Sequence, residues 1–342
     1  MFSLHQTPGR TAFVNEKEYL FFSGYSYLGM NHVPDFISLL HEGITRFGAV
    51  FPSSRISNTV LDLYSNTESY LSDLTQKSDT ILFQSGFTAG KAAIETLEKD
   101  TSIFQSPFCH PAIRINKNSS LTFTDWANET VQLINSHQSL KTPVILSDSL
   151  NQLTADLFDF SFLESIQQKV ICIIDDSHGI GLLGKSGQGI SCLLPNNENI
   201  EYIITYSLSK ALNIQAGAIS CSIKSRADKI RKTSWYTAVT PPSPVMLFAF
   251  NQAKDLYSLQ LSKLSLQKKQ FQNMLVDHKE IKYHKDLPVY ILPEALDEDY
   301  FSEKGIIISS FAYPDPTGKK INRVVINALH TQEDYKKLTN SL

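Results

Sequence analysis

The sequence has few cysteines, no long hydrophobic run and almost no excess of charge. Its 342 residues include 4 cysteines, and none of these forms a C-x-x-C pair. We therefore expect neither a disulfide framework nor a zinc cage, and we expect a reducing, cytoplasmic compartment. No stretch approaches the ~20 apolar residues that span a bilayer, and residues 1–22 lack the pattern of a signal peptide. The formal net charge of -3 argues against nucleic acid or an anionic membrane as a partner.

The composition is that of a folded protein with a large core. Hydrophobic residues make up 42% of the chain and aromatic residues 11%, which excludes a disordered or collagen-like chain. At roughly 150 residues per domain, the length predicts about two domains.

Short β-branched runs alternate with amphipathic stretches between about residues 60 and 225. Runs such as KVICIID and EYIITYS are apolar nearly throughout, which is typical of strands covered on both faces. Helices between such strands indicate a mostly parallel sheet in a doubly wound α/β domain. The predicted strands are Thr80–Gln84, Ser102–Gln105, Leu121–Asp125, Pro143–Ser147, Lys169–Asp175, Tyr202–Ser207 and Gly217–Ile223; the predicted helices are Leu61–Gln76, Thr88–Glu98 and Phe162–Gln168.

A proline-rich segment, T-P-P-S-P at residues 240–244, marks a boundary. A helical pattern follows over Val245–Asp277, then three strand candidates and a final short helix. We expect an N-terminal segment (1–45), a large α/β domain (46–240) and a small α+β domain (241–342). The strand candidates are Val289–Leu292, Gly305–Phe311 and Arg323–Ala328.

Residues 179–186, G-I-G-L-L-G-K-S, match the phosphate-binding pattern G-x-x-x-x-G-K-[ST]. That pattern functions when the first Gly follows a strand and the Lys opens a helix. Here Asp-Asp-Ser-His follows the strand, and the residues after Ser186 (GQGISCLLP) are no helix start. We therefore expect an exposed loop at Lys185, and a nucleotide-binding protein is kept only as a rival.

Three chemically active residues follow two buried strands. Asp175 and His178 come at the end of one, and Lys210 follows the next. The carboxyl ends of such strands border the ligand crevice of an open α/β sheet. A lysine, a carboxylate and an imidazole suit pyridoxal phosphate, which needs a lysine for its imine and an acid that keeps its ring nitrogen protonated.

A phosphate cradle is predicted independently. The strand Thr80–Gln84 runs into Ser85-Gly86-Phe87 and then a helical pattern. Small residues at a helix N-terminus expose backbone N–H groups to an anion. Ser207, three residues before Lys210, can add a hydroxyl.

Seven ordered motifs resemble the α-oxoamine synthases, a family of fold-type I pyridoxal-phosphate enzymes that includes 8-amino-7-oxononanoate synthase and glycine C-acetyltransferase. The resemblance runs from about Gly9 to the C-terminus. The motifs are FFSGYSYLGM, FGAVFPSSRIS, FQSGFTAGKAAI, IIDDSHGIGLLGKSGQG, YSLSKALNIQAGAI, WYTAVTPP and NRVVINALHTQEDYKKL.

The resemblance implies a role for each matching residue. Lys210 would form the imine, Asp175 would pair with the ring nitrogen, and His178 would bind the phenolic oxygen of the ring. His110 would stack on the ring and meet the substrate, and Arg323 would hold the amino-acid carboxylate. The resemblance implies that the phosphate is bound by Ser85, Gly86, Phe87 and Ser207, with Thr237 or Thr240 from the second subunit of a homodimer.

Three departures from the family pattern concern substrate handling. Tyr25 replaces an Asn that faces the substrate, Asn58 replaces a Gly, and Gln152 replaces a phosphate-binding Ser. The resemblance implies that a small amino acid, alanine or glycine, condenses with an acyl-CoA or acyl-carrier thioester, as in biotin biosynthesis. An aminotransferase, or a related amino-acid enzyme without acyl-CoA use, is the alternative. A relic without cofactor is disfavoured because Lys210, Asp175 and His178 are all present.

Overall fold

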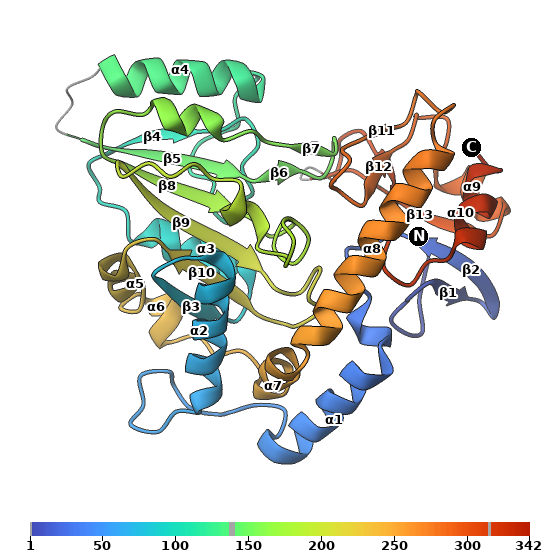
Figure 1. Ribbon diagram of the computed structural model, residues 1–342, viewed down its shortest axis with the longest axis horizontal. Helices are drawn as coiled ribbons and strands as arrows, with labels where there is room; N and C mark the ends of the chain where they lie inside the picture. The colour runs from blue at the N-terminus through green and yellow to red at the C-terminus, as the bar shows by residue number, and fades with distance from the viewer. Residues whose placement is uncertain (1, 137–140, 314–315) are drawn as a thin grey trace.

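Two six-stranded sheets organise the residues that this computed structural model describes, 2–136, 141–313 and 316–342 (Figure 1). In the first sheet, β9, β8, β5 and β4 run parallel to one another, whereas β10 runs antiparallel to both of its neighbours, β9 and β3. Its order is β3 (Asp79–Phe83), β10 (Gly217–Cys221), β9 (Ile200–Ser207), β8 (Val170–Asp175), β5 (Thr142–Asp148) and β4 (Thr101–Gln105). The mostly parallel sheet agrees with the fold predicted from the sequence.

The strands of this sheet are apolar throughout because both faces are covered. Along β8, Ile171 and Ile173 join one core cluster, whereas Cys172 and Ile174 join the other. Since successive side chains of a strand point to opposite faces, this division follows directly from the pleat. On the first face pack α3 (Gly86–Glu95), α5 (Lys224–Ile230) and α6 (Ser234–Thr237); on the second pack α2 (Asp62–Thr75) and α4 (Phe123–Ser136).

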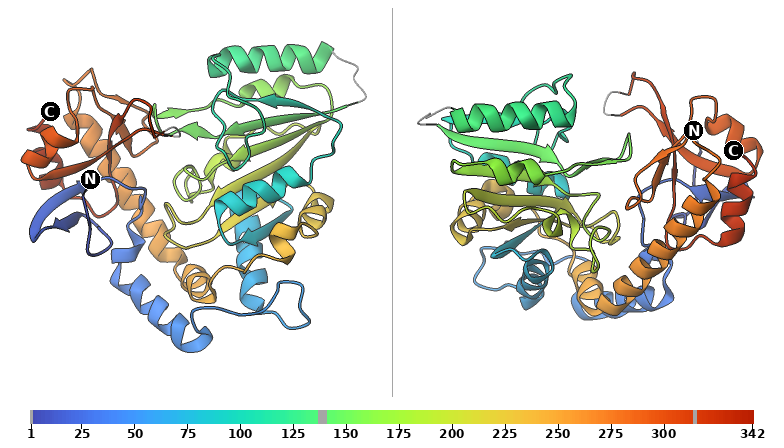
Figure 2. Two further views of the ribbon diagram at one scale, coloured as in Figure 1. Left: turned by 180° about the vertical axis from the view of Figure 1, so that it is seen from behind. Right: turned by 45° about the horizontal axis from the view of Figure 1, so that its top comes forward.

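The second sheet joins the two ends of the chain. The N-terminal hairpin of β1 (Thr11–Val14) and β2 (Lys17–Phe22) adds to the C-terminal strands, with β2 parallel to β13 (Ile306–Phe311). The sheet continues through β14 (Ile321–Val325), β12 (Val289–Ile291) and β11 (Lys282–Tyr283), beside α9 (Glu298–Glu303) and α10 (Gln332–Thr339). Figure 2 shows both termini on this lobe. The boundaries at residues 45 and 240 stay predictions.

The predicted helix Val245–Asp277 is two helices, so this expectation was wrong. α7 (Pro244–Gln252) is separated from α8 (Lys254–Met274) by Ala253. The φ of -96° and ψ of 17° at Ala253 leave the helical region. α7 packs beside α1 (Pro34–Phe47), and the break lets α8 turn toward the second sheet (Figure 1).

The predicted strand Leu121–Asp125 was also wrong, because the segment opens helix α4. Thr122 Oγ1 accepts from the Asp125 backbone N–H at 3.1 Å and donates to the Asp125 carboxylate at 2.6 Å. This is a capping arrangement. Apolar and polar residues alternate in LTFTD, and this alternation is typical of a strand. Instead of the predicted helix Phe162–Gln168 there is a short 3-10 turn, η2 (Ser161–Ser165).

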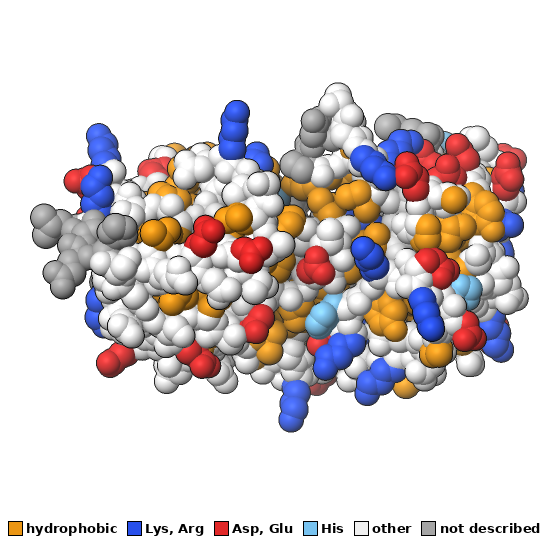
Figure 3. All heavy atoms as spheres, turned by 90° about the horizontal axis from the view of Figure 1, so that it is seen from above, with side chains coloured by type: hydrophobic (Ala, Val, Ile, Leu, Met, Phe, Trp, Pro, Cys, Tyr) orange, Lys and Arg blue, Asp and Glu red, His pale blue; other side chains and the backbone are white. Residues whose placement is uncertain are grey.

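The surface carries both signs of charge. Acidic and basic side chains are interspersed on the face seen in Figure 3. Among the described residues, no helix has both the length and the apolar character that crossing a membrane requires.

His330 fastens the N-terminal hairpin to the C-terminal end and should make stability sensitive to acid. Its Nδ1 accepts from the Asn327 N–H at 3.0 Å, and its Nε2 lies 3.1 Å from the Phe21 carbonyl. Burial lowers the pKa of His330 from 6.5 to about 4, against the opposing effect of Asp334. As the pH falls, the His330 ring therefore takes up its proton in the unfolded chain before it does so in the folded chain. The free energy of unfolding then decreases as the pH drops from about 6.5 to about 4.

We expect His330→Gln, which keeps one donor and one acceptor, to flatten this acid-induced loss by up to about 3 kcal/mol. Urea unfolding at pH 7 and pH 4.5 measures it. An equal loss in the variant and the natural chain would contradict the assignment.

Candidate active site

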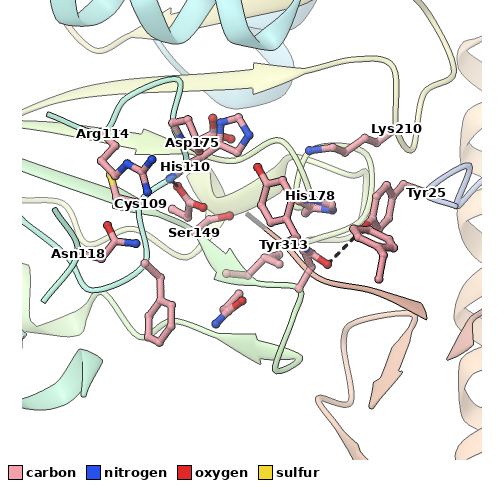
Figure 4. Close-up of a pocket in the computed structure, with 17 residues that line it drawn as sticks. Tyr25, Cys109, His110, Arg114, Asn118, Ser149, Asp175, His178, Lys210 and Tyr313 are labelled. Carbon is pink, nitrogen blue, oxygen red and sulfur yellow. Dashed lines mark hydrogen bonds between the residues drawn. The ribbon is translucent and has the colours of Figure 1, made fainter. Parts of the chain in front are cut away.

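A cavity of about 270 Å³ opens where the carboxyl ends of β5 and β8 and the loop after β9 meet the second sheet (Figure 4). The structure brings five of the predicted site residues to its wall: Tyr25, His110, Asp175, His178 and Lys210. Gln152 lines it as well. The cavity lies at the crevice that an open α/β sheet uses for ligands.

Asp175 ends β8 and is held as a hydrogen-bond acceptor. The Ser177 backbone N–H donates to its Oδ1 at 2.9 Å, and the residue is 7% exposed. In register on β5 stands Asp148, whose Oδ1 accepts from the His110 N–H at 2.8 Å. Burial and the neighbouring charge of Asp175 raise the pKa of Asp148 well above its usual range. The site thus favours the protonated form of Asp148.

Lys210 reaches into the cavity from the loop after β9. Figure 4 shows its amine directed toward the side where Asp175 and His110 lie. Burial lowers the pKa of Lys210, and the carboxylates of Asp175 and Asp148 partly oppose this. No hydrogen bond holds its amine among the residues that the structure describes. A lysine amine that deprotonates more readily is suited to attack a carbonyl.

The two histidines are held as neutral rings. Burial, the Lys210 charge and His110 lower the pKa of His178, whose Nδ1 lies 2.9 Å from the Tyr27 hydroxyl. The pKa of His110 is also lowered, chiefly by burial. Its Nδ1 accepts from the Ala112 N–H at 3.1 Å, which leaves Nε2 to carry the proton.

The residues of the predicted phosphate cradle lie at the start of α3, and their role stays a prediction. The Ser85 side chain caps the helix through the Thr88 N–H, and the first-turn amides of Gly86 and Phe87 have no partner within the helix. A Cβ on Gly86 would lie 2.8 Å from the Ser207 Cβ, so glycine is what lets the start of α3 approach the end of β9. Amides, a helix N-terminus and a nearby hydroxyl fit a phosphate group.

We expect Gly86→Ala to weaken pyridoxal phosphate binding about tenfold or more, because the added methyl group pushes the amides away from Ser207. Fluorescence titration of the apoprotein with the cofactor measures this. Unchanged affinity in a variant with native circular dichroism would contradict the cradle.

None of the six predicted phosphate residues lines this cavity: Ser85, Gly86, Phe87, Ser207, Thr237 and Thr240. Phe87 is 48% exposed, Thr240 is exposed, and Thr237 donates through its hydroxyl to the Thr233 carbonyl at 3.1 Å. The roles of Thr237 and Thr240 across a dimer stay predictions.

Arg323 of β14 lies beside Tyr25 and Gln152. Its Nη1 donates to the Gln152 Oε1 and, at 3.3 Å, to the Tyr25 hydroxyl. Gln152 was placed by the resemblance at the phosphate, but its hydrogen bonds go to Arg323 and Tyr25 instead. Gln152 therefore lies on the side of the site where Arg323 and Tyr25 are. The loop that contains Asn58 contributes no residue to the cavity wall.

The segment 179–186 is a loop built around Asp176, and it does not open an α-helix as a phosphate-binding loop would. Asp176 Oδ2 accepts from the Ile190 N–H at 2.8 Å, and a Cβ on Gly179 or Gly189 would collide with this carboxyl group. Burial raises the pKa of Asp176 to about 7. Lys185 is exposed, and the segment after it forms only a four-residue 3-10 turn, η3 (Gly189–Cys192).

The sequence reasoning missed two residues of the site. Asp148 directly follows the predicted strand Pro143–Ser147, so its position at a strand end was a usable signal. Tyr313, whose ring lies 6.5 Å from that of His110, belongs to the loop after β13 and carried no signal in the sequence.

The chain is similar to known proteins over most of its length. A family model described as aminotransferase class I and II matches residues 40–342. An 8-amino-7-oxononanoate synthase of Buchnera aphidicola subsp. Baizongia pistaciae is 27% identical over 360 residues, covering 99% of this chain and 92% of its own. The enzyme of the same name from Petrotoga mobilis is 25% identical over 359 residues, covering 97% and 89%.

Solved structures are similar in fold. Serine palmitoyltransferase of Sphingomonas wittichii superposes with a TM-score of 0.82 at 14% identity, covering 99% of this chain and 90% of that one. The 8-amino-7-oxononanoate synthase of Francisella tularensis gives 0.70 at 20% identity, covering 94% and 95%.

Fold and site together define a pyridoxal-phosphate enzyme of fold type I. The chain belongs to the aminotransferase class I and II family. The predicted fold class, the cofactor and the likeness to the α-oxoamine synthases are thereby confirmed.

Proposed function

We propose that this protein is an acyltransferase that condenses a small amino acid, alanine or glycine, with an acyl thioester, as its relatives named 8-amino-7-oxononanoate synthase do. The observation that carries the proposal is the joint presence of Lys210, Asp175 and His178 around one cavity, with Arg323 beside it. The first three suit the cofactor, and the arginine suits a carboxylate.

Each of these side chains has a task in such a reaction. Bound pyridoxal phosphate supplies a protonated ring that accepts the electron pair left on the substrate Cα. Asp175 would keep the ring nitrogen protonated, and the Lys210 amine would take the proton from the substrate Cα. Arg323 would bind the substrate carboxylate, and the His110 Nε2–H would donate a hydrogen bond to the thioester substrate.

The size of the amino acid follows from the neighbours of Arg323. Tyr25 and Gln152 fill the space next to its guanidinium, which limits the room for a substrate side chain there. Alanine or glycine therefore suits this site better than a long side chain.

The purified holoenzyme tests the proposal directly. Alanine and glycine are each supplied with pimeloyl-CoA and with the corresponding acyl-carrier thioester, and the release of the free thiol is followed. Thiol release that depends on the amino acid supports the acyltransferase. Turnover with a keto acid and no thiol release supports the alternative, an aminotransferase.

A homodimer is part of the proposal. Large hydrophobic side chains are exposed on the segment after α1, with Ile56 64%, Val50 58% and Val60 53% exposed. The same segment contacts α6 through Ser54, whose hydroxyl donates to the Thr237 carbonyl at 3.0 Å. Exposed apolar side chains next to a predicted phosphate residue favour an interface there. Sedimentation of the Ile56→Asp variant, compared with that of the natural chain, tests whether this segment forms the dimer interface.

A cytoplasmic location is likewise proposed. It rests on the four free cysteines, three of which are buried.

A further inference from the structure

The turn that carries Gln152 is built to present one side chain to β14. The two-residue strands β6 (Leu150–Asn151) and β7 (Asp156–Leu157) pair as a hairpin, and Gln152 opens its turn. Asn151 Oδ1 accepts from the Leu153 N–H at 3.0 Å, and Ala155 adopts a left-handed φ of 56° to close the turn. The position of Gln152 is therefore fixed by its backbone.

Arg323 is a buried cation without a counter-ion. It is 0% exposed, and no carboxylate lies within ion-pair distance of it among residues 2–136, 141–313 and 316–342. All its acceptors are neutral: the Gln152 Oε1, the Tyr25 hydroxyl and, at 3.4 Å, the Ser309 hydroxyl. Its Nε has no acceptor, and the guanidinium carbon lies 4.7 Å from the centre of the Phe311 ring.

A buried charge in such surroundings is costly until an anion joins it. The Nε–H is the donor that lacks an acceptor among the described residues. Of the three neutral acceptors around the guanidinium, Gln152 is the one that sits on a hairpin turn and lines the cavity with a flexible side chain.

We propose that Gln152 is a positioning and selectivity residue, whose amide oxygen occupies Arg323 in the resting enzyme and gives way to the carboxylate of the amino-acid substrate. The proposal rests on the proposed function, since it takes Arg323 as the carboxylate site. The substrate carboxylate must displace the amide oxygen of Gln152. The substrate therefore binds more weakly than it would to an Arg323 that Gln152 did not occupy. A substrate without a carboxylate leaves the amide in place and gains nothing from Arg323.

Propionate is the probe, because it carries the carboxylate of alanine but no amine and does not react. Its binding to the holoenzyme is measured by calorimetry, together with the melting temperature. Gln152→Ala removes the competitor, and we expect propionate to bind about three- to tenfold more tightly. Gln152→Glu places a carboxylate on Arg323, and we expect affinity to fall at least about tenfold and the melting temperature to rise.

Gln252→Glu, the same change at an exposed position at the end of α7, is the matched control and should bind propionate as the natural enzyme does. Opposite effects of the alanine and glutamate variants are not produced by general damage to the fold. Equal affinity in Gln152→Glu and the control, or weaker binding in Gln152→Ala, overturns the proposal. Because propionate needs no thioester, absence of thiol release would count against the acyltransferase and not against this role of Gln152.

Discussion

Lys210→Ala is expected to abolish turnover, with kcat lowered about a thousandfold or more, or about 4 kcal/mol in the barrier. The variant removes the lysine amine that, within the described part of the chain, reaches the cavity wall beside Asp175. The same change removes the covalent tie to the cofactor, so the variant should also give no borohydride-stable adduct at position 210. Thiol release and mass spectrometry of the reduced protein measure the two effects.

Lys185→Ala is the matched control, since Lys185 lies in the loop that resembles a nucleotide-binding sequence and is exposed. We expect it to behave as the natural enzyme in both measurements. If Lys185→Ala lost activity while Lys210→Ala kept it, the nucleotide-binding rival would be favoured and the cofactor site would be wrong.

The strongest parts of the site were predictable because they follow directly from strand ends. Asp175, His178 and Lys210 come just after two strands that are apolar on both faces, and such strands are readable from sequence. The sheet order then brings their ends together, since β8 and β9 are neighbours. Their meeting at one cavity needed only local patterns and the rule that ligands bind at the carboxyl edge.

Other parts depend on contacts that no local pattern encodes. The N-terminal hairpin pairs with β13 across nearly 300 residues, and nothing in KEYLFF indicates that partner. Gln152 was misplaced because motif alignment gives a position along the chain, whereas its side chain turns toward Arg323. The segment Leu121–Asp125 was misread because its alternation outweighed the Thr122–Asp125 cap.

Asp175→Asn is expected to lower kcat/KM by about a hundred- to a thousandfold. An anion about 4 Å from a cationic ring nitrogen gains up to about 4 kcal/mol at an effective dielectric near 20, and the amide forfeits this attraction. Asparagine keeps the size of the side chain and an oxygen for the Ser177 N–H, so the fold should be retained. The ring nitrogen then loses its proton, and the electron pair on the substrate Cα is no longer stabilised.

The neighbour Asp148 provides the comparison, because it stands in register with Asp175 on β5 and is equally part of the cavity wall. Its pKa is raised by burial and by Asp175, so it contributes less negative charge than an ordinary aspartate. Asp148→Asn, which keeps an oxygen for the His110 N–H, should therefore reduce kcat/KM less than about tenfold. A larger loss in Asp148→Asn than in Asp175→Asn would mean that Asp148, not Asp175, holds the charge facing the ring.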